Sequence, residues 1–153
     1  MADIMRKSYN LCNFNTFANG YYLDLTTGLP KEYGSSPNRI ATLTPINVDT
    51  ISNVIVNYNS SLTGDTKFIY SLFNNNTLIR RVAENMIGTV IDVSAGNRLY
   101  LSLYNLANTV YTTSISSLIV NIGSTALPYK PYYAHSLKKF DGVAWQDATV
   151  HEF

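Results

Sequence analysis

Strict alternation of apolar and polar side chains over residues 90–104 constrains this chain more than any other feature. The stretch reads VIDVSAGNRLYLSLY, and its second half places leucine at every second position. The two sets are Leu99, Leu101 and Leu103 on one side, and Tyr100, Ser102 and Tyr104 on the other. A period of two predicts a β-strand with a buried leucine face and a solvent-facing tyrosine face. We expect a second strand from Val90, joined to the first by a tight turn at Ala95-Gly96-Asn97.

Similar short patterns, separated by turn residues, recur along the chain. They predict strands at 21–25, 39–43, 53–58, 67–73, 77–82 and 117–122. The linker from Asn59 to Asp65 suits a hairpin between the third and fourth of these strands. Asn74-Asn75-Asn76 predicts another turn, because asparagine tolerates left-handed backbone. The only helix-like fragment, Val82 to Met86, is too short to stand alone.

The predicted fold class is therefore all-β. About eight or nine strands without a convincing helix favour an antiparallel β-sandwich, jelly-roll-like in topology, with short N- and C-terminal arms. Parallel sheets would need crossover helices that the sequence lacks. A chain of 153 residues is long enough to bury such a core as one domain without a disulfide or metal.

Three regions are expected along the chain. Residues 1–8 form a short polar N-terminal arm, residues 9–126 the sandwich, and residues 127–153 an extension rich in proline and tyrosine. Asp141-Gly142 predicts a small hairpin in the extension. An appendage this small cannot bury itself, so we expect it to attach to the sandwich, to another subunit or to a larger particle. The residues expected to mediate attachment are Lys138, Lys139, Phe140, Trp145 and Phe153.

Charge and hydropathy disfavour two classes of partner. Charged residues make up only 14% of the chain and the net charge is +1, too little to bind a nucleic-acid backbone. No apolar run reaches transmembrane length, so we expect no membrane insertion. The first ten residues contain no signal-peptide core. A protein that acts outside a cell without such a signal must leave by a route other than secretion, and lysis of a host cell in whose cytoplasm it is made, as for a virus particle, is one such route.

Residues that commonly perform catalysis have simpler explanations in this sequence. Paired carboxylates could hydrolyse glycosidic bonds, but Asp24, Asp49, Asp65 and Asp92 all fall beside turn residues, where aspartate is common. His135 and His151 lie in the extension without a recognisable nucleophile nearby. Cys12 has no partner for an intrachain disulfide or a zinc site, and is expected to be a small buried residue. We therefore predict no catalytic residue, no metal and no cofactor.

Aromatic side chains are the remaining candidates for binding. The twelve tyrosines and one tryptophan offer flat apolar rings with a polar tip, which suits stacking against sugars as well as subunit interfaces. Interface or core positions are expected for most of them. The candidates for contact with a glycan or a partner are Tyr21, Tyr22, Tyr58, Tyr100, Tyr104 and Tyr111, with Trp145 in the extension.

Two stretches resemble minor structural proteins of bacteriophages. NLCNFNTFANGYYLDLTTG at residues 10–28, followed by FIYSLFNNNTLIRRV and VIDVSAGNRLYLSLYN, is similar to the carbohydrate-binding-module-like jelly roll of tail-fibre and baseplate proteins. KKFDGVAWQDATV at residues 138–150 is similar to short Gly-x-x-Trp units near the C-termini of such proteins. Unlike long tail fibres, the chain has no coiled-coil stalk, collagen-like repeat or enzyme module.

The resemblance implies a non-enzymatic virion structural protein, an accessory component of the tail, baseplate or fibre that contacts host-surface glycans. The implied partners are other virion proteins and further copies of the chain, with a trimer as the expected oligomer. A capsid-bound head fibre or decoration protein is the alternative, and a cell-wall-degrading enzyme is a third, weaker one.

Overall fold

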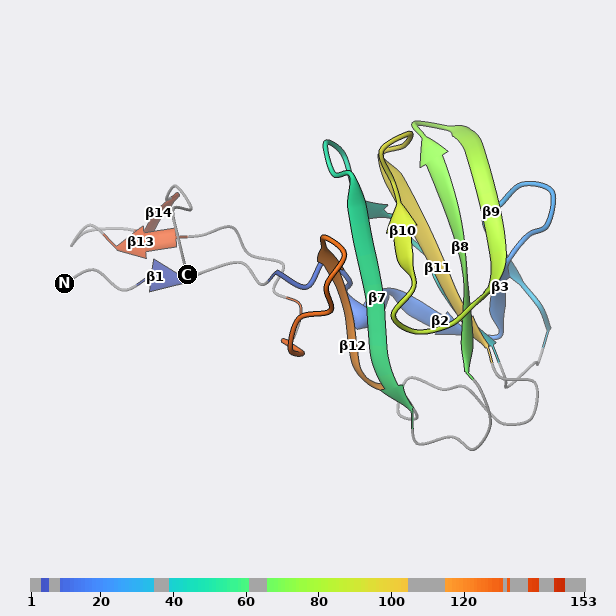
Figure 1. Ribbon diagram of the computed structural model, residues 1–153, viewed down its shortest axis with the longest axis horizontal. Helices are drawn as coiled ribbons and strands as arrows, with labels where there is room; N and C mark the ends of the chain where they lie inside the picture. The colour runs from blue at the N-terminus through green and yellow to red at the C-terminus, as the bar shows by residue number, and fades with distance from the viewer. Residues whose placement is uncertain are drawn as a thin grey trace.

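A computed structural model of the chain describes residues 4–5, 9–34, 39–60, 66–104, 115–130, 132, 138–140 and 145–147. Its regular structure is almost entirely β, and all strand pairs are antiparallel. Figure 1 shows two twisted sheets facing each other, with a smaller group of strands at the chain termini. The protein is an antiparallel, jelly-roll-like β-sandwich, as the alternating pattern predicted.

The larger sheet has the strand order β2, β5, β11, β8, β9, and β6 pairs beside one end of β11. These strands are β2 (Phe17–Asn19), β5 (Arg39–Thr42), β6 (Ile46–Asn47), β8 (Lys67–Asn74), β9 (Thr77–Asn85) and β11 (Arg98–Tyr104). The smaller sheet, in the order β10, β7, β12, contains β10 (Val90–Asp92), β7 (Asn53–Ser60) and β12 (Ile115–Ile122). One turn of 3-10 helix, η1 (Phe14–Thr16), leads into β2.

The core lies between these two sheets, and β11 is at its centre. Leu99, Leu101 and Leu103 are at most 1% exposed, as predicted. They pack with buried side chains of β7 in the opposite sheet, including Val54 and Val56. Full burial of each leucine contributes about 1.5–3 kcal/mol, so this face of β11 is a major source of the stability of the sandwich.

The prediction that the other face of β11 meets solvent is wrong. Ser102 is 1% exposed and Tyr104 is 7% exposed, while Tyr100 is partly buried. A hairpin of β3 (Tyr21–Leu23) and β4 (Pro30–Glu32) covers this face, and its Leu23 packs in a second core cluster with Tyr104. Polar alternation identifies the two faces of a strand, but it cannot show that a third layer covers the polar one.

Two hairpins predicted from the sequence are also wrong, the one within residues 90–104 and the one between the strands at 53–58 and 67–73. β10 pairs with β7 in the smaller sheet, whereas β11 pairs with β5, β6 and β8 in the larger one. β7 and β8 likewise belong to opposite sheets. Packed sheets are only about 10 Å apart, so a connection of a few residues can cross between them as easily as it can close a hairpin. Residues 93–97 therefore link two sheets.

Other local predictions are confirmed. The Asn74-Asn75-Asn76 segment turns the chain between β8 and β9, which pair along their length, and Asn75 has the expected positive φ of 53°. The helix-like fragment 82–86 instead continues β9 as far as Asn85. Tertiary pairing with β8 overrides the weak helical tendency of so short a segment.

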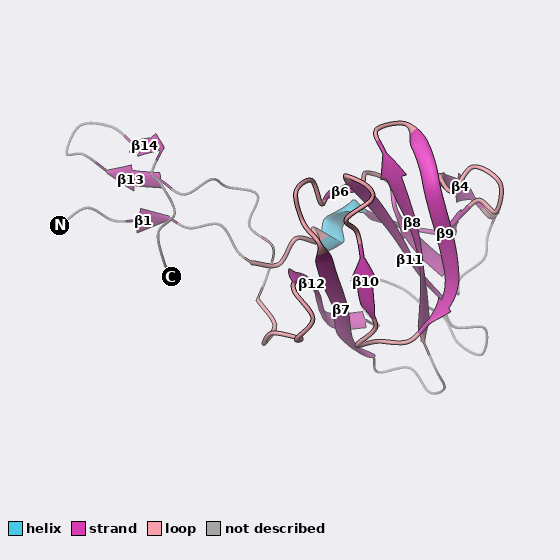
Figure 2. Cartoon of the chain, turned by 45° about the horizontal axis from the view of Figure 1, so that its top comes forward, coloured by secondary structure: helices cyan, strands magenta, loops and turns pink. Residues whose placement is uncertain are grey.

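The chain ends meet in a separate three-stranded sheet, which we call the terminal sheet. It has the order β1 (Ile4–Met5), β13 (Lys138–Phe140), β14 (Trp145–Asp147). Phe140 is the register partner of Trp145, which confirms the predicted hairpin in the extension, although its Asp141-Gly142 turn lies outside the described residues. The N-terminal arm is not independent of the extension, because Ile4 pairs with Lys139. Both views show the terminal sheet beside the sandwich (Figures 1 and 2).

The two segments that lead to the terminal sheet leave the sandwich together. Asn10 is 2% exposed, and its Nδ2 donates to the carbonyl oxygens of Leu118 at 3.0 Å and Lys130 at 2.9 Å. The Tyr9 hydroxyl donates to the carbonyl of Pro128. The N-terminal and C-terminal segments are thus held side by side where they leave the sandwich.

Candidate binding site

Two asparagines hold one end of the sandwich together. The Asn75 backbone N–H donates to Asn97 Oδ1 at 2.8 Å, and Asn97 Nδ2 donates to Asn75 Oδ1 at 2.9 Å. The Asn97 backbone N–H donates to the Phe73 carbonyl, and the Asn97 carbonyl accepts a hydrogen bond from the Val48 N–H. Asn97 therefore fixes the β8–β9 turn, the β10–β11 connection and the segment after β6 relative to one another.

Gly96 is required by the close approach of backbones at this end. A Cβ atom at this position would lie 2.6 Å from the Phe73 carbonyl oxygen and 2.7 Å from Leu72 Cδ1. A Cβ atom does not approach another non-bonded heavy atom this closely, so any larger residue would push the connection away from β8. Gly96 also closes a turn, because its backbone N–H donates to the Val93 carbonyl at 3.1 Å, so the predicted turn is present and the glycine has a packing role in addition.

Two hollows flank Arg98 next to this pair of asparagines. The first, which we call the Arg98 hollow, has a volume of about 220 Å³ and is lined by Leu29, Phe73, Asn75, Asn76, Arg98 and Tyr100. The second has a volume of about 280 Å³ and is lined by Pro45, Asn47, Asp49, Asn97 and Arg98. Amide and guanidinium groups thus share the Arg98 hollow with two aromatic rings.

The lining of the Arg98 hollow combines a stacking surface with hydrogen-bond donors. The rings of Phe73 and Tyr100 meet edge to face, with centroids 5.6 Å apart and an interplanar angle of 74°. Arg98 is exposed, and its Nη1 lies 3.5 Å from Asn76 Oδ1. The ion pair between Lys31 and Asp24 is the only one within the described ranges, so no described carboxylate lies within ion-pair distance of Arg98.

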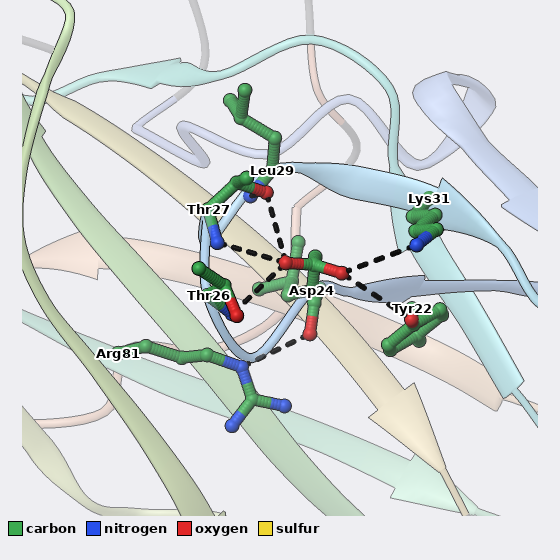
Figure 3. A network of polar contacts seen from close by, with 8 residues as sticks. Tyr22, Asp24, Thr26, Thr27, Leu29, Lys31 and Arg81 are labelled. Atoms are coloured by element: carbon green, nitrogen blue, oxygen red, sulfur yellow. Dashed lines mark hydrogen bonds and ion pairs between the residues drawn. The ribbon is translucent and has the colours of Figure 1, made fainter.

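Leu29 reaches the hollow from the loop between β3 and β4, which is held by Asp24. Asp24 Oδ1 accepts from the backbone N–H groups of Thr26 at 2.9 Å and Thr27 at 2.8 Å (Figure 3). These bonds are the main reason that the pKa of Asp24 is lowered to about 2. Lys31 Nζ lies 3.5 Å from the other carboxylate oxygen.

The loop is also fastened to the larger sheet. Arg81 Nε on β9 donates to the Leu23 carbonyl at 3.0 Å (Figure 3). Gly28 has a φ of +71°, and a Cβ there would lie 2.6 Å from Leu78 Cδ1 on the same strand. Glycine therefore lets the loop approach β9 closely and brings Leu29 to the edge of the Arg98 hollow.

The aspartates are placed mainly as the turn interpretation predicted. Asp24 and Asp92 both bind backbone N–H groups two residues ahead, and the Ser94 hydroxyl and N–H bonds lower the pKa of Asp92. Asp49 is exposed and lines the second hollow, and Asp65 lies outside the described residues. Cys12 is 1% exposed, as expected, and burial raises the pKa of its thiol to about 12.

The structure does not gather the candidate tyrosines into one platform. Tyr100 lines the Arg98 hollow. Tyr21 and Tyr22 are partly buried on β3, and Tyr22 packs edge to face against Tyr33. Tyr58 is 2% exposed with its hydroxyl donating to the Thr66 carbonyl, and Tyr104 is buried, so neither ring offers a face to a ligand. Tyr111 lies outside the described residues.

The attachment residues are described only in their backbone. Lys138, Lys139 and Phe140 form β13, and Trp145 begins β14, so four of the five predicted residues belong to the terminal sheet. Phe153 lies outside the described residues.

Sequence reasoning missed most of the Arg98 hollow. Asn75 was identified only as a turn residue, and Asn76, Asn97, Arg98, Phe73 and Leu29 were not proposed as ligands. The sequence did contain a signal for this site. Two turns that contain asparagine, at residues 74–76 and 95–97, each adjoin a strand that carries an aromatic residue. Their meeting depends on the pairing of β8 with β11, which local patterns do not reveal.

The described part of the chain contains no group of three or more His, Cys, Asp or Glu side chains placed to hold a metal ion. No helix in this part of the chain is both long and apolar enough to cross a membrane.

Comparison with models of known protein families, with curated proteins and with solved structures finds no match for this chain.

Proposed function

We propose that this protein is a non-enzymatic structural component of a bacteriophage particle, located in the tail or baseplate. The terminal sheet attaches it to neighbouring virion proteins, and the sandwich contacts host-surface glycans. The observation that carries the attachment role is the joint exit of both terminal segments at Asn10 and Lys130, followed by the pairing of β1 with β13. The resemblance of residues 10–28 and 138–150 to phage structural proteins supplies the particle as the setting.

The size of the terminal sheet supports attachment. Its strands contain only two or three residues each, and sheets this small are marginal in water unless they pack on something else. Within the described residues, β1 and β14 are its edge strands. Edge strands bind partners by strand addition, and their register then fixes the geometry of the complex. Another virion protein or a further copy of this chain, as in a trimer, would complete the sheet.

The chemistry of the surface around the Arg98 hollow favours contact with a glycan over an enzymatic activity. With few charges in the chain, the exposed side chains that line the Arg98 hollow are two amides, one guanidinium and Leu29, and the partly buried Tyr100 lies among them. Sugars present hydroxyls to such donors and apolar C–H faces to aromatic rings. In Figure 1 the β3 strand that leads to Leu29 lies on the side of the sandwich away from the terminal sheet. That arrangement suits a protein anchored at one side and exposed at the other.

Purified particles test this proposal. Quantitative mass spectrometry should find the protein at a fixed ratio to the major tail proteins after the particles are washed in high salt. A lysis enzyme would instead remain in the soluble lysate and clear host cell walls. Absence from washed particles, or wall clearance by the purified protein, would contradict the proposal.

Labelling with antibody-coated gold then locates the protein by electron microscopy. Label at the tail tip supports the baseplate or fibre role. Label over the capsid would replace it with the alternative, a head fibre or decoration protein, because the terminal sheet could attach to either structure.

A further inference from the structure

We propose that the Arg98 hollow binds a single sugar residue that carries a carboxylate, with the carboxylate on Arg98 and the ring against Tyr100. This inference rests on the proposed glycan contact and is independent of where the protein sits in a particle. It defines the chemical class of glycan, an acidic polysaccharide or a glycan ending in a uronic-acid-type sugar.

The size of the hollow limits the ligand to one ring. Its volume of about 220 Å³ is below the range of about 300–1,000 Å³ that is typical of sites for drug-sized molecules. Its lining includes Leu29 and the two residues of the β8–β9 turn, Asn75 and Asn76. A terminal sugar, or one residue of a longer chain passing over the sandwich end, fits this space.

Tyr100 supplies the apolar surface for the ring. It is partly buried and lines the hollow, and the buried Phe73 packs against it edge to face. Tyr100 also stands on β11, which is hydrogen-bonded on both sides. A rigid aromatic ring presented in this way loses little conformational freedom when a sugar stacks on it.

Arg98 selects for negative charge. It is exposed at the rim of the hollow, and its contact with Asn76 Oδ1, at 3.5 Å, is at the long limit for a hydrogen bond. No described carboxylate pairs with it. The planar guanidinium fork matches a carboxylate in a bidentate geometry, which is stronger and more directional than a bond to a neutral hydroxyl.

The asparagine pair places the remaining donors. The Asn75 side-chain oxygen and backbone N–H are both used by Asn97, which leaves Asn75 Nδ2 as the group that can face a ligand. Asn76 adds a second amide beside it. Because Asn97 fixes the turn before any ligand arrives, these donors are preorganised for the sugar hydroxyls.

The test titrates the full chain, labelled with nitrogen-15, with methyl β-D-glucuronide and with the matched neutral sugar methyl β-D-glucoside. Amide shifts are expected at Asn75, Asn76 and Arg98. The glucoside should bind about tenfold more weakly, since one charge-assisted hydrogen bond contributes about 1.5 kcal/mol or more. Inorganic phosphate alone is a third probe and should bind more weakly than the glucuronide, because it lacks a ring to stack on Tyr100.

Variants assign the interaction to the hollow. Arg98→Gln should reduce glucuronide affinity to the level of the glucoside, and Arg98→Lys should retain part of the difference. Lys130→Gln removes the same charge from an exposed position in the C-terminal segment and should leave both affinities unchanged. The same spectra report whether each variant is folded.

Equal affinity for the two sugars, shifts away from the hollow, no binding at all, or an undiminished preference in Arg98→Gln would overturn this inference. Phosphate binding as tight as the glucuronide would also overturn it, because the site would then be a simple anion site. None of these results bears on incorporation into particles, which is measured separately.

Discussion

Asn10 and Lys130, 120 positions apart in sequence, are joined by a hydrogen bond of 2.9 Å from Asn10 Nδ2 to the Lys130 carbonyl. The same side chain donates to Leu118 and accepts from the backbone N–H groups of Cys12 and Val120. One buried amide therefore connects the N-terminal segment, β12 and the C-terminal segment. Both of its oxygen lone pairs and both of its N–H groups have a partner.

Replacement of Asn10 by alanine should lower the free energy of unfolding by about 3 kcal/mol, because several buried backbone groups lose their partner together. Urea denaturation followed by circular dichroism measures this loss. Asn15→Ala, which alters an exposed asparagine on η1, is the matched control and should stay within about 0.5 kcal/mol of the parent. Similar losses in both variants would show that the network around Asn10 has no special role.

Asn10→Asp should make the stability depend on pH in a defined direction. A carboxylate at this position would face the carbonyl oxygens of Leu118 and Lys130 in a buried site, so its folded-state pKa should rise above the unfolded value. A raised acid pKa means that the folded state binds more protons, and stability should increase as the pH falls. Urea midpoints that rise from pH 7 to pH 5 in Asn10→Asp, relative to the parent, would support this; parallel curves would contradict it.

Asn97→Ala should destabilise the sandwich end by about 2 kcal/mol, since it removes two side-chain hydrogen bonds to Asn75. Asn76→Ala changes an exposed neighbour with only one long contact and is the control, with an expected change within about 0.5 kcal/mol. Hydrogen exchange at the Asn75 backbone amide should be faster than in the parent for Asn97→Ala, but not for Asn76→Ala. Unchanged exchange at that amide would mean that the turn is held by other contacts.

The sequence predicted the sandwich from alternation, and β11 shows both the strength and the limit of that reasoning. Leu99, Leu101 and Leu103 were placed correctly because strand geometry alone determines which side chains share a face. The strands that pair with β10 and β11 were predicted wrongly, because a short connection between two strands is equally compatible with a hairpin and with a crossing from one sheet to the other. Tyr104 was placed in solvent because no local signal reveals that the β3–β4 hairpin covers it.

Asp24 should stabilise the β3–β4 loop at neutral pH and lose this effect in acid. Its folded-state pKa of about 2 is below the ordinary value, so its contribution to stability is complete above the unfolded-state pKa near 3.8 and is lost as the pH falls toward 2. Asp24→Ala should melt at a lower temperature than the parent at pH 7, and the difference should shrink between pH 4 and pH 2. A melting-temperature difference that stays constant over this range would contradict the assignment.

Cys12 should be inert in the folded protein. Burial raises the pKa of its thiol to about 12, so almost no reactive thiolate exists at neutral pH, and the side chain is 1% exposed. A thiol-specific chromogenic reagent should react within seconds in denaturant and only at the rate of unfolding without it. Rapid labelling of the native protein would show that the segment around Cys12 opens readily.

We propose that the terminal sheet attaches the sandwich to a phage particle. The most direct measurement compares the full chain with a truncation that lacks residues 137–153, each supplied during infection by a phage whose own copy is deleted. Because the described residues of the core between the larger and the smaller sheet all lie between Cys12 and Val120, the truncated protein should melt cooperatively. We predict that the full chain is found in purified particles at a fixed ratio and that the folded truncation is strongly depleted from them. Equal incorporation of both proteins, or absence of the full chain from the particles, would contradict the account.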